Sequence, residues 1–519
     1  MLKKYYFVIA IFILLFASSL YGNNLSISNV TNTNPGLPNP QISFVISWDN
    51  SWYVNNGTDD VWDAIWIIVK YQNVPTTTPN CESLLKWEHS LMSSASTDFA
   101  IGYPLEIVRV ADNRGVFIKR ENPGTGTVQP TTATITLNLG AGTYNFSVVG
   151  IEMAYVPAGA FNLGDGASTN TFSSLNIASE NLIIGGAAGG GIQADIPATY
   201  PKGYNAFYCM KYEISQKQYV EFLNLLTYDQ QTTRTSVAPS SDPGLTGVCA
   251  MVTNCTNRNG IKIIDKGINP TRSALYGNDL VTAPGDAFNS ANDGLSIASN
   301  FLKWSDLLAY LDWACLRPIT NLEFEKVARG KEARLANEYI WGSTLITQAV
   351  SNDLTDAGLA TETSNSTGNQ GLCAYGAAVD KGPLRVGFPA TSTSTRSTAG
   401  AAYYGVQNLG GNLWEMVSGG NNAGGLGYKI TSASTDIGDG TLTPTGEADI
   451  PNWQASPSVV GACNMWHMEM RGGSFKSANT TVRTSDRSQN SVLCGGVAPY
   501  GFGNDVDQRL SDVGGRGVR

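Results

Sequence analysis

The apolar pattern of this chain changes near residue 150, and this change limits the folds open to it. Before it, short segments alternate apolar and polar residues and are rich in β-branched and aromatic side chains, as is typical of strands. We expect strands at Gln41–Trp48, Asp63–Tyr71, Leu105–Val110, Gly115–Lys119, Thr132–Leu139 and Thr143–Val149. Short strands separated by turn formers predict a β-sandwich over residues 24–150.

After residue 150, helical patterns are few and loops are long. We expect one helix after the capping box Ser215–Gln218, one from near Ser305 that stops before Pro318, and one over Thr320–Gly330. Three short helices cannot fill residues 151–519. The sequence therefore predicts an α+β protein with a sheet-forming first domain and a loop-rich second domain.

The first 22 residues predict a signal peptide. Lys3 and Lys4 precede the apolar run Tyr5–Phe16, which ends in the small residues 17–19. The run is shorter than the roughly 20 apolar residues that cross a bilayer, so we expect cleavage and no stable membrane span afterwards. The expected location is secreted, periplasmic or at the cell surface.

Net charge limits the possible partners of this protein, and its cysteines suggest a disulfide. The net charge of -9 and the absence of a basic cluster argue against nucleic acid, which proteins bind by neutralising phosphates with Lys and Arg. In an exported protein, disulfides are plausible, and Cys249 and Cys255 are close enough to close a small loop. Pairings among the remaining cysteines stay open, and His89 is expected to be a surface or edge residue, not a metal ligand.

Seven short motifs follow in order along the second domain. They are Met153–Phe161, Phe207–Ser215, Arg317–Glu325, Trp341–Gly342, Asn408–Glu415, Arg471–Phe475 and Gly514–Arg519. Together they resemble the formylglycine-generating enzyme family, also called the sulfatase-modifying factor family. For residues 151–519 the resemblance implies a variant of the C-type lectin fold. Independently, we expect Arg317, Arg471 and Arg516 to tie loops together through bidentate hydrogen bonds.

The resemblance also implies structural calcium. In the family, a loop of this form wraps one Ca²⁺ with side-chain and main-chain oxygens, and here Asn408, Gly411, Leu413 and Glu415 fall on those positions. The alternative is that Glu415 pairs with an arginine and holds no ion. A second calcium site is matched loosely by residues 352–353, Asn352 and Asp353.

The family's oxidase chemistry lacks its ligands in this sequence. Family members that make formylglycine oxidise a substrate cysteine with two cysteines that bind Cu(I), and the first of these falls at Ser477. A serine hydroxyl is a hard, neutral ligand and does not replace a thiolate, so copper is not expected. Return of Cys494 by a loop is an alternative, but it would leave one thiolate without a partner. A related iron-dependent branch needs several histidines, and only His89 and His467 are present.

These observations favour an exported, non-catalytic binding or structural protein, a pseudoenzyme of the family. By analogy, the expected ligand face is formed by Phe475, Ser477, Arg483, Arg487 and Trp414. Its partner would be a protein or glycan at the cell surface. The alternatives are an oxidoreductase of the formylglycine-generating type with atypical ligands, and a protein whose N-terminal sandwich performs the docking.

Overall fold

The computed structural model describes residues 24–55, 57, 60–74, 86–189, 195–243, 247–280, 287–368, 370–376, 381–391, 393–419, 428–431, 433–453, 468–489 and 508–519. The predicted signal peptide at residues 1–22 lies outside these ranges, as do His467 and Cys494. Among the described residues, no helix has both the length and the apolar character needed to cross a membrane.

The N-terminal part consists of strands, and all six predicted segments are among them. The strands are β1 (Ser26–Asn32), β2 (Gln41–Asn55), β3 (Asp60–Asn73), β4 (Glu88–Ser90), β5 (Phe99–Ile101), β6 (Leu105–Arg109), β7 (Val116–Arg120), β8 (Gly124–Thr136) and β9 (Tyr144–Val156). The largest difference is at β8, which starts eight residues before the predicted strand because Gly124 pairs with Tyr53 near the end of β2.

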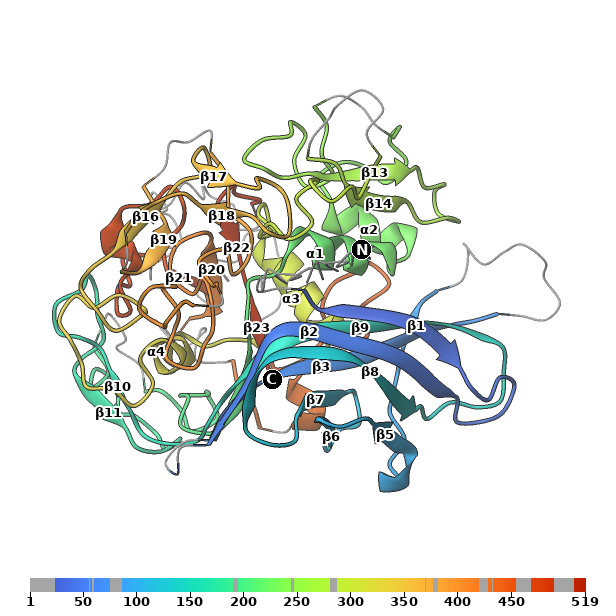
Figure 1. Cartoon of the computed structure of the whole chain (residues 1–519), viewed down its shortest axis with the longest axis horizontal. Helices are drawn as coiled ribbons and strands as arrows, with labels where there is room; N and C mark the ends of the chain where they lie inside the picture. Colours follow the sequence, from blue (N-terminus) through green and yellow to red (C-terminus); the bar gives the residue numbers. More distant parts are fainter. Residues whose placement is uncertain are drawn as a thin grey trace, which may run out of the picture.

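These strands belong to one twelve-stranded sheet that continues into the second half of the chain. Its main order is β15-β23-β12-β9-β3-β2-β8-β5, and β1, β4, β6 and β7 pair beside this path. Strand β9 runs through the predicted domain boundary at residue 150 and pairs with β12 (Phe207–Met210) beyond it. Figure 1 shows the blue strands continuing toward the red β23 near the C-terminus.

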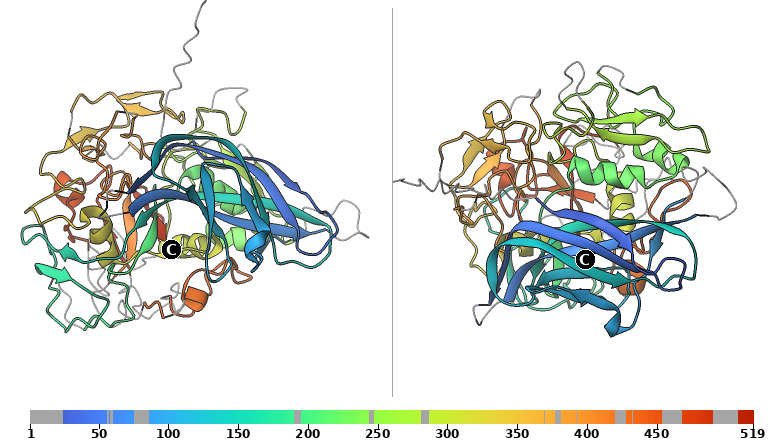
Figure 2. Two further views of the ribbon diagram at one scale, coloured as in Figure 1. Left: turned by 60° about the horizontal axis from the view of Figure 1, so that its bottom comes forward. Right: turned by 45° about the vertical axis from the view of Figure 1, so that its right-hand side comes forward.

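Strand β3 is buried on both faces, which explains its nearly unbroken apolar sequence. Ile65, Ile67 and Val69 pack into a core shared with β2 and β8. The alternate residues Trp66 and Ile68 belong to a second core that includes side chains of α1 (Gln216–Asn224) and α3 (Trp304–Trp313). The helices therefore cover the face of β3 that points away from β2 and β8, as the two further views in Figure 2 also show.

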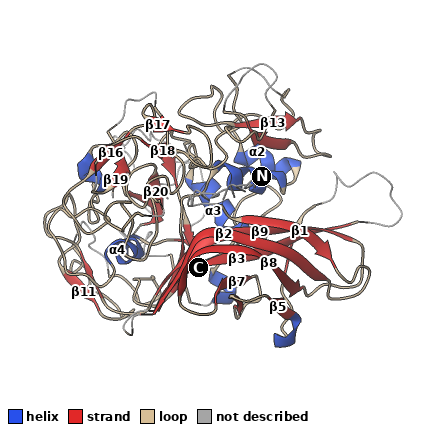
Figure 3. Ribbon diagram, viewed as in Figure 1, coloured by secondary structure: helices blue, strands red, loops and turns tan. Residues whose placement is uncertain are grey.

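The second half of the chain is mostly loop, drawn in tan in Figure 3. Its remaining helices are α2 (Tyr228–Arg234), α4 (Asn321–Arg329) and α5 (Ala433–Asp436). Its strands are β10 (Phe161–Leu163), β11 (Leu175–Ile177), β13 (Ile261–Asp265), β14 (Leu275–Asn278), β15 (Arg317–Pro318), β16 (Thr347–Ala349), β17 (Leu354–Thr355), β18 (Thr363–Ser364), β19 (Leu372–Ala374), β20 (Trp414–Ser418), β21 (Met468–Arg471), β22 (Val513–Gly514) and β23 (Gly517–Val518). The model is thus α+β with many strands and few helices.

The predicted helix starts are confirmed. The Ser215 hydroxyl caps the N–H of Gln218 at 3.3 Å, and the Gln218 side chain accepts the N–H of Ser215 at 3.0 Å. Thr320 caps α4 in the same way, and the helix ends at Gly330, whose positive φ of 62° suits glycine. Helix α2 was not predicted, although Thr227 and Gln230 form a third capping box ahead of it.

One cysteine contact was predicted from the sequence and another was not. The disulfide between Cys249 and Cys255 is confirmed, with an S–S distance of 2.03 Å. Cys315, at the end of α3, lies against His89 of β4, with 3.5 Å between the sulfur and Nε2. His89 is indeed on an edge strand, but a cysteine partner 226 residues away could not be read from the sequence.

Burial makes His89 a source of acid sensitivity. Burial, and then the nearby Lys70 ammonium, hold the pKa of His89 well below its usual value. The folded protein therefore keeps this ring neutral while the unfolded chain protonates it below about pH 6.5. We expect acidification from pH 7 to pH 5 to lower the free energy of unfolding, with about 2 kcal/mol of that loss due to His89.

The contribution of His89 to this loss of stability is measured by denaturant unfolding at pH 7 and pH 5. The unaltered protein is compared with the His89→Gln variant. The variant should lose less stability between pH 7 and pH 5 than the unaltered protein does. An equal or greater loss in the variant would contradict the assignment to His89.

Candidate functional site

Two small sheet regions bring six of the seven motifs together, all except Trp341–Gly342. Strand β12 pairs with β9 on one side and β23 on the other, and β23 also pairs with β15. Strand β20 lies between β21 and β22 in a separate three-stranded sheet. The C-terminal motif contributes to both sheets, through β22 and β23, so it connects the two regions.

A buried ion pair forms the centre of this connection. Arg516 lies between β22 and β23, and its Nε and Nη2 donate to the Glu415 carboxylate over distances of 2.5 to 2.9 Å. The same guanidinium donates to the main-chain oxygens of Met210 at 3.1 Å and Gln407 at 2.9 Å. Both side chains are fully buried. The predicted bracing role of Arg516 is confirmed.

The other two predicted arginine braces are also present. Arg317 makes a bidentate contact with Glu323, at 2.9 and 2.7 Å, and thereby ties β15 to α4. Arg471 reaches the main-chain oxygen of Thr484 at 2.6 Å and the Glu325 carboxylate at 3.3 Å. Guanidinium groups are suited to connecting loops because they are planar and offer several hydrogen-bond donors in fixed directions.

A second buried carboxylate, Glu213, lies beside the ion pair. Its oxygens accept the N–H of Leu413 at 3.0 Å and the side-chain amide of Asn412 at 2.6 Å. Burial, and then the negative charge of Glu415, raise the pKa of Glu213 to about 8. Both donors that Glu213 satisfies belong to the Asn408–Glu415 loop.

The predicted calcium residues lie in this buried region. Asn408 accepts the N–H of Gly387 at 2.5 Å through its side-chain oxygen. At Gly411, φ is 69° and an added Cβ would lie 2.3 Å from the Cys373 sulfur, so only glycine fits. The alternative foreseen for Glu415, a pairing with an arginine, is what the structure contains. Arg516 balances the charge of Glu415, and calcium at these four positions stays a prediction.

The second predicted calcium pair lies on the protein surface and not in this buried region. Asn352 and Asp353 are exposed on the loop that leads into β17. Two exposed side chains supply fewer oxygens than the six to eight that Ca²⁺ takes, so other residues or water would have to complete such a site.

Ser477, which the sequence resemblance aligns with the family's first copper-binding cysteine, closes a local turn. Its hydroxyl accepts the N–H of Ser474 at 2.6 Å and the hydroxyl of Thr481 at 3.0 Å, and it donates to the Ser474 carbonyl at 3.0 Å. The neighbouring Phe475 N–H donates to the Asn412 carbonyl at 2.8 Å. The Ser477 turn is therefore attached directly to the predicted calcium loop.

Only part of the predicted ligand face reaches the surface. Trp414, Phe475 and Arg487 are 1%, 2% and 0% exposed, because they fill the interior around the motifs. Arg487 donates to Glu469 at 2.9 Å and lies 3.9 Å from the centre of the Phe172 ring. In this conformation these three side chains cannot contact a ligand. Ser477 and Arg483 are partly exposed and remain available for one.

The described free thiols are poor metal ligands as they stand. Cys209, Cys315 and Cys373 are buried, and burial raises the pKa of Cys209 and Cys315 to about 12 and that of Cys373 further. All three are therefore neutral at physiological pH, whereas a soft metal binds the thiolate. The position of Cys373 against Gly411 was not foreseen, because their contact joins segments far apart in the sequence.

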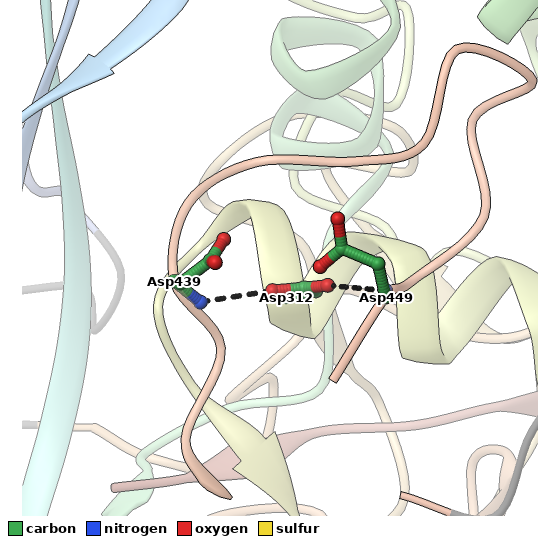
Figure 4. Close-up of side chains that lie close together, drawn as sticks. All are labelled: Asp312, Asp439 and Asp449. Carbon is green, nitrogen blue, oxygen red and sulfur yellow. Dashed lines mark hydrogen bonds between the residues drawn. The ribbon is translucent and has the colours of Figure 1, made fainter. Parts of the chain in front are cut away.

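Three carboxylates at the end of α3 could also suggest a metal centre. The oxygens of Asp312, Asp439 and Asp449 lie within 4.8 Å of one another (Figure 4). The Asp312 oxygens, however, accept the main-chain N–H groups of Asp439 at 2.9 Å and Asp449 at 3.0 Å. Burial, and then Asp439, raise the pKa of Asp312 to about 8. These hydrogen bonds give the cluster a structural role, which is to attach the 439–449 loop to α3.

Comparison with known protein families gives one match. A family model described as the sulfatase-modifying factor enzyme 1-like domain matches residues 149–502, more than half of the chain. No curated protein matches the chain closely enough to be reported as a relative.

The buried ion pair leads to a stability prediction. Substituting Arg516→Met would leave Glu415 buried without its cation and beside Glu213, so we expect a loss of about 3 to 5 kcal/mol in the free energy of unfolding. Guanidinium chloride unfolding followed by tryptophan fluorescence measures the loss.

The control is Lys266→Met, which removes the exposed ion pair with Asp242. That variant should unfold with the unaltered protein, because exposed pairs contribute little. If Arg516→Met were as stable as this control, the ion pair would not be a structural centre.

Proposed function

Because this chain belongs to the sulfatase-modifying factor enzyme 1-like family, we propose that it is an exported binding or structural protein that does not oxidise cysteine. One observation carries the proposal: the Ser477 hydroxyl, which the resemblance aligns with the first copper-binding cysteine, is engaged in a local turn. A hydroxyl held in this way neither ionises nor offers the soft donor that Cu(I) selects.

The scaffold of the family supports the non-catalytic role. The arginine braces and the Asn408–Glu415 loop are present, and the described residues of the Ser477 turn carry hydroxyls and no thiol. A domain that keeps its framework and loses its reactive groups suits presentation of a surface. The proposed fold assigns the N-terminal strands to a β-sandwich and the remainder to a C-type lectin variant.

The proposed ligand is a protein or glycan at the cell surface. Its binding face would be built from Ser477 and Arg483, which keep exposed surface after Trp414, Phe475 and Arg487 are assigned to the interior. Export and a secreted, periplasmic or surface location form part of the same proposal and rest on the signal-like residues 1–22.

Structural calcium also belongs to this proposal. Asn408, Gly411, Leu413 and Glu415 would supply the oxygens, with Glu213 as a further carboxyl group nearby. When bound, calcium would supply positive charge and hold the loop rigid. The observation that supports a cation here is geometric: Glu213 and Glu415 are both buried next to the same loop, and Glu415 is paired with Arg516.

A copper assay tests the absence of oxidase chemistry. We expect the purified protein to fail to withdraw Cu(I) from a chromophoric chelator, and to consume no oxygen with a cysteine-containing peptide. The peptide mass should remain unchanged. Binding of one Cu(I) per chain together with oxygen uptake and peptide oxidation would favour the oxidoreductase instead.

A calcium assay tests the structural ion separately. We expect calcium to raise the melting temperature of the protein depleted of metal, because the ion offsets the repulsion between Glu213 and Glu415. Differential scanning calorimetry with and without added calcium measures this shift.

The Glu415→Gln variant should lose most of the calcium response, whereas Asp353→Asn should keep it if the first site is the one that matters. Equal melting temperatures of the unaltered protein with calcium and with chelator would contradict a calcium site.

A further inference from the structure

Three buried charged residues lie side by side in the large sheet. Asp63 lies on β3, and Glu152 of β9 pairs with Ile65, two residues further along β3, so both carboxyl side chains point to the same face. Lys211 directly follows β12, and its N–H donates to the Glu152 carbonyl at 2.9 Å. Asp63, Glu152 and Lys211 are 1%, 5% and 3% exposed. Three neighbouring segments thus bring one lysine and two carboxyl groups together away from water.

The Lys211 ammonium contacts both carboxyl groups. Its Nζ is 3.2 Å from Asp63 Oδ2 and 3.3 Å from Glu152 Oε2. Groups held at such distances need little further movement before a bond can form between them. The centres of the Trp52 and Tyr212 rings lie 4.6 and 5.5 Å from the same nitrogen. Aromatic side chains therefore take the place of water around the lysine.

The two carboxyl groups differ in their hydrogen bonds. Asp63 Oδ1 accepts the Ser51 hydroxyl and the Trp52 N–H, both at 2.9 Å, and Oδ2 accepts the Trp48 indole N–H at 3.1 Å. Apart from the lysine, no residue that the structure describes donates to either oxygen of Glu152. Donors fixed around a carboxyl oxygen stabilise the negative charge that develops there when the carbon is attacked. Asp63 is therefore the carboxyl group that is prepared for attack.

Glu152 is suited to hold a proton in this interior. Burial raises the pKa of Glu152, and the nearby Lys211 ammonium opposes that effect only in part. Burial lowers the pKa of Lys211, but Tyr212 and the two carboxyl groups raise it by more. The lysine is thus mostly charged, and its neutral amine forms when a proton passes to Asp63. This transfer removes two charges from a poorly solvated interior, and it need succeed only once per chain if a permanent bond follows.

We propose that Lys211 and Asp63 form an intramolecular amide cross-link, with Glu152 as the proton relay. The neutral amine attacks Asp63 Cγ, a bond between Nζ and Cγ forms, and the bond between Cγ and Oδ2 breaks. Glu152 gives its proton to the departing hydroxyl, which leaves as water, and recovers a proton from the nitrogen. The reaction needs no oxidant, reductant or further reactant, because an ammonium carboxylate pair contains the same atoms as an amide and one water.

The cross-link removes the imbalance of this buried group. One ammonium no longer faces two carboxyl groups, and the amide N–H is a donor beside Glu152, which otherwise has none but the lysine. The bond joins residues that are 148 positions apart in the sequence. It therefore fastens strand β3 of the N-terminal part to the segment after β12, and it closes a long loop that restricts the unfolded chain.

Peptide mass mapping of the full chain, after reduction of its disulfide and denaturation, tests the proposal. Trypsin cleaves after a free lysine but not after one whose Nζ is acylated. We expect no cleavage after Lys211. We also expect the peptide 203–217 to be linked to the peptide that ends at Lys70, with a mass one water below the sum of the two. Fragmentation of this pair should place the bond between Lys211 and Asp63.

Three variants separate the roles of these residues. Lys211→Arg keeps a buried cation but removes the nucleophile, so the two peptides should be unlinked. Glu152→Gln keeps the size of the side chain and should leave most of the freshly purified chain unlinked, because a positioned acid–base group accelerates such a step about 100-fold or more. The control Glu106→Gln alters the carboxyl partner of Lys119, another ion pair of the same sheet, and should stay linked.

Complete cleavage after Lys211 in the folded, unaltered protein would overturn the proposal. A bond from Lys211 to Glu152 would contradict the assignment of Asp63, and full linkage in Glu152→Gln would contradict the proton relay. If the Lys211 and Glu152 variants fail to fold, the peptide masses of the unaltered protein and of Glu106→Gln still decide whether the cross-link forms.

Discussion

The pairing of Arg516 with Glu415 is the interaction on which the rest of this structure depends. It joins the three-stranded sheet that contains β20 to the arm of the large sheet that contains β12 and β23. Few regular elements surround it, so the loops are positioned mainly by buried side chains that reach main-chain oxygens. Such contacts are costly to break because each leaves a buried charge or polar group without its partner.

This framework is compatible with the proposed loss of the family's oxidase chemistry. Glu213, Asn412 and Phe475 connect the framework to the Ser477 turn through hydrogen bonds that do not involve the side chain of Ser477. Under the proposal, a serine in place of a copper-binding cysteine at this position would change the reactivity of the turn and leave its support intact. The proposed recognition surface would then consist of the polar residues of the turn that keep exposed surface.

Local patterns in the sequence predicted much of the fold. Alternation located six strands, and capping boxes located α1 and α4, because both signals depend on neighbouring residues. Contacts between distant segments were beyond such reasoning: the sequence did not reveal which carboxylate Arg516 would meet, or that Cys315 would lie against His89. The burial of Trp414 and Arg487 was not predicted, for the same reason. A sequence motif indicates which residues belong to a site, but it does not indicate which of their side chains face the solvent.

The most direct test of the central claim is the X-ray absorption spectrum at the copper edge of the protein mixed with one equivalent of Cu(I). The account predicts a spectrum without two sulfur ligands on copper, because the Ser477 turn offers hydroxyls and the described thiols are buried and neutral. A copper ion coordinated by two thiolates, with one of them from Cys494, would contradict it.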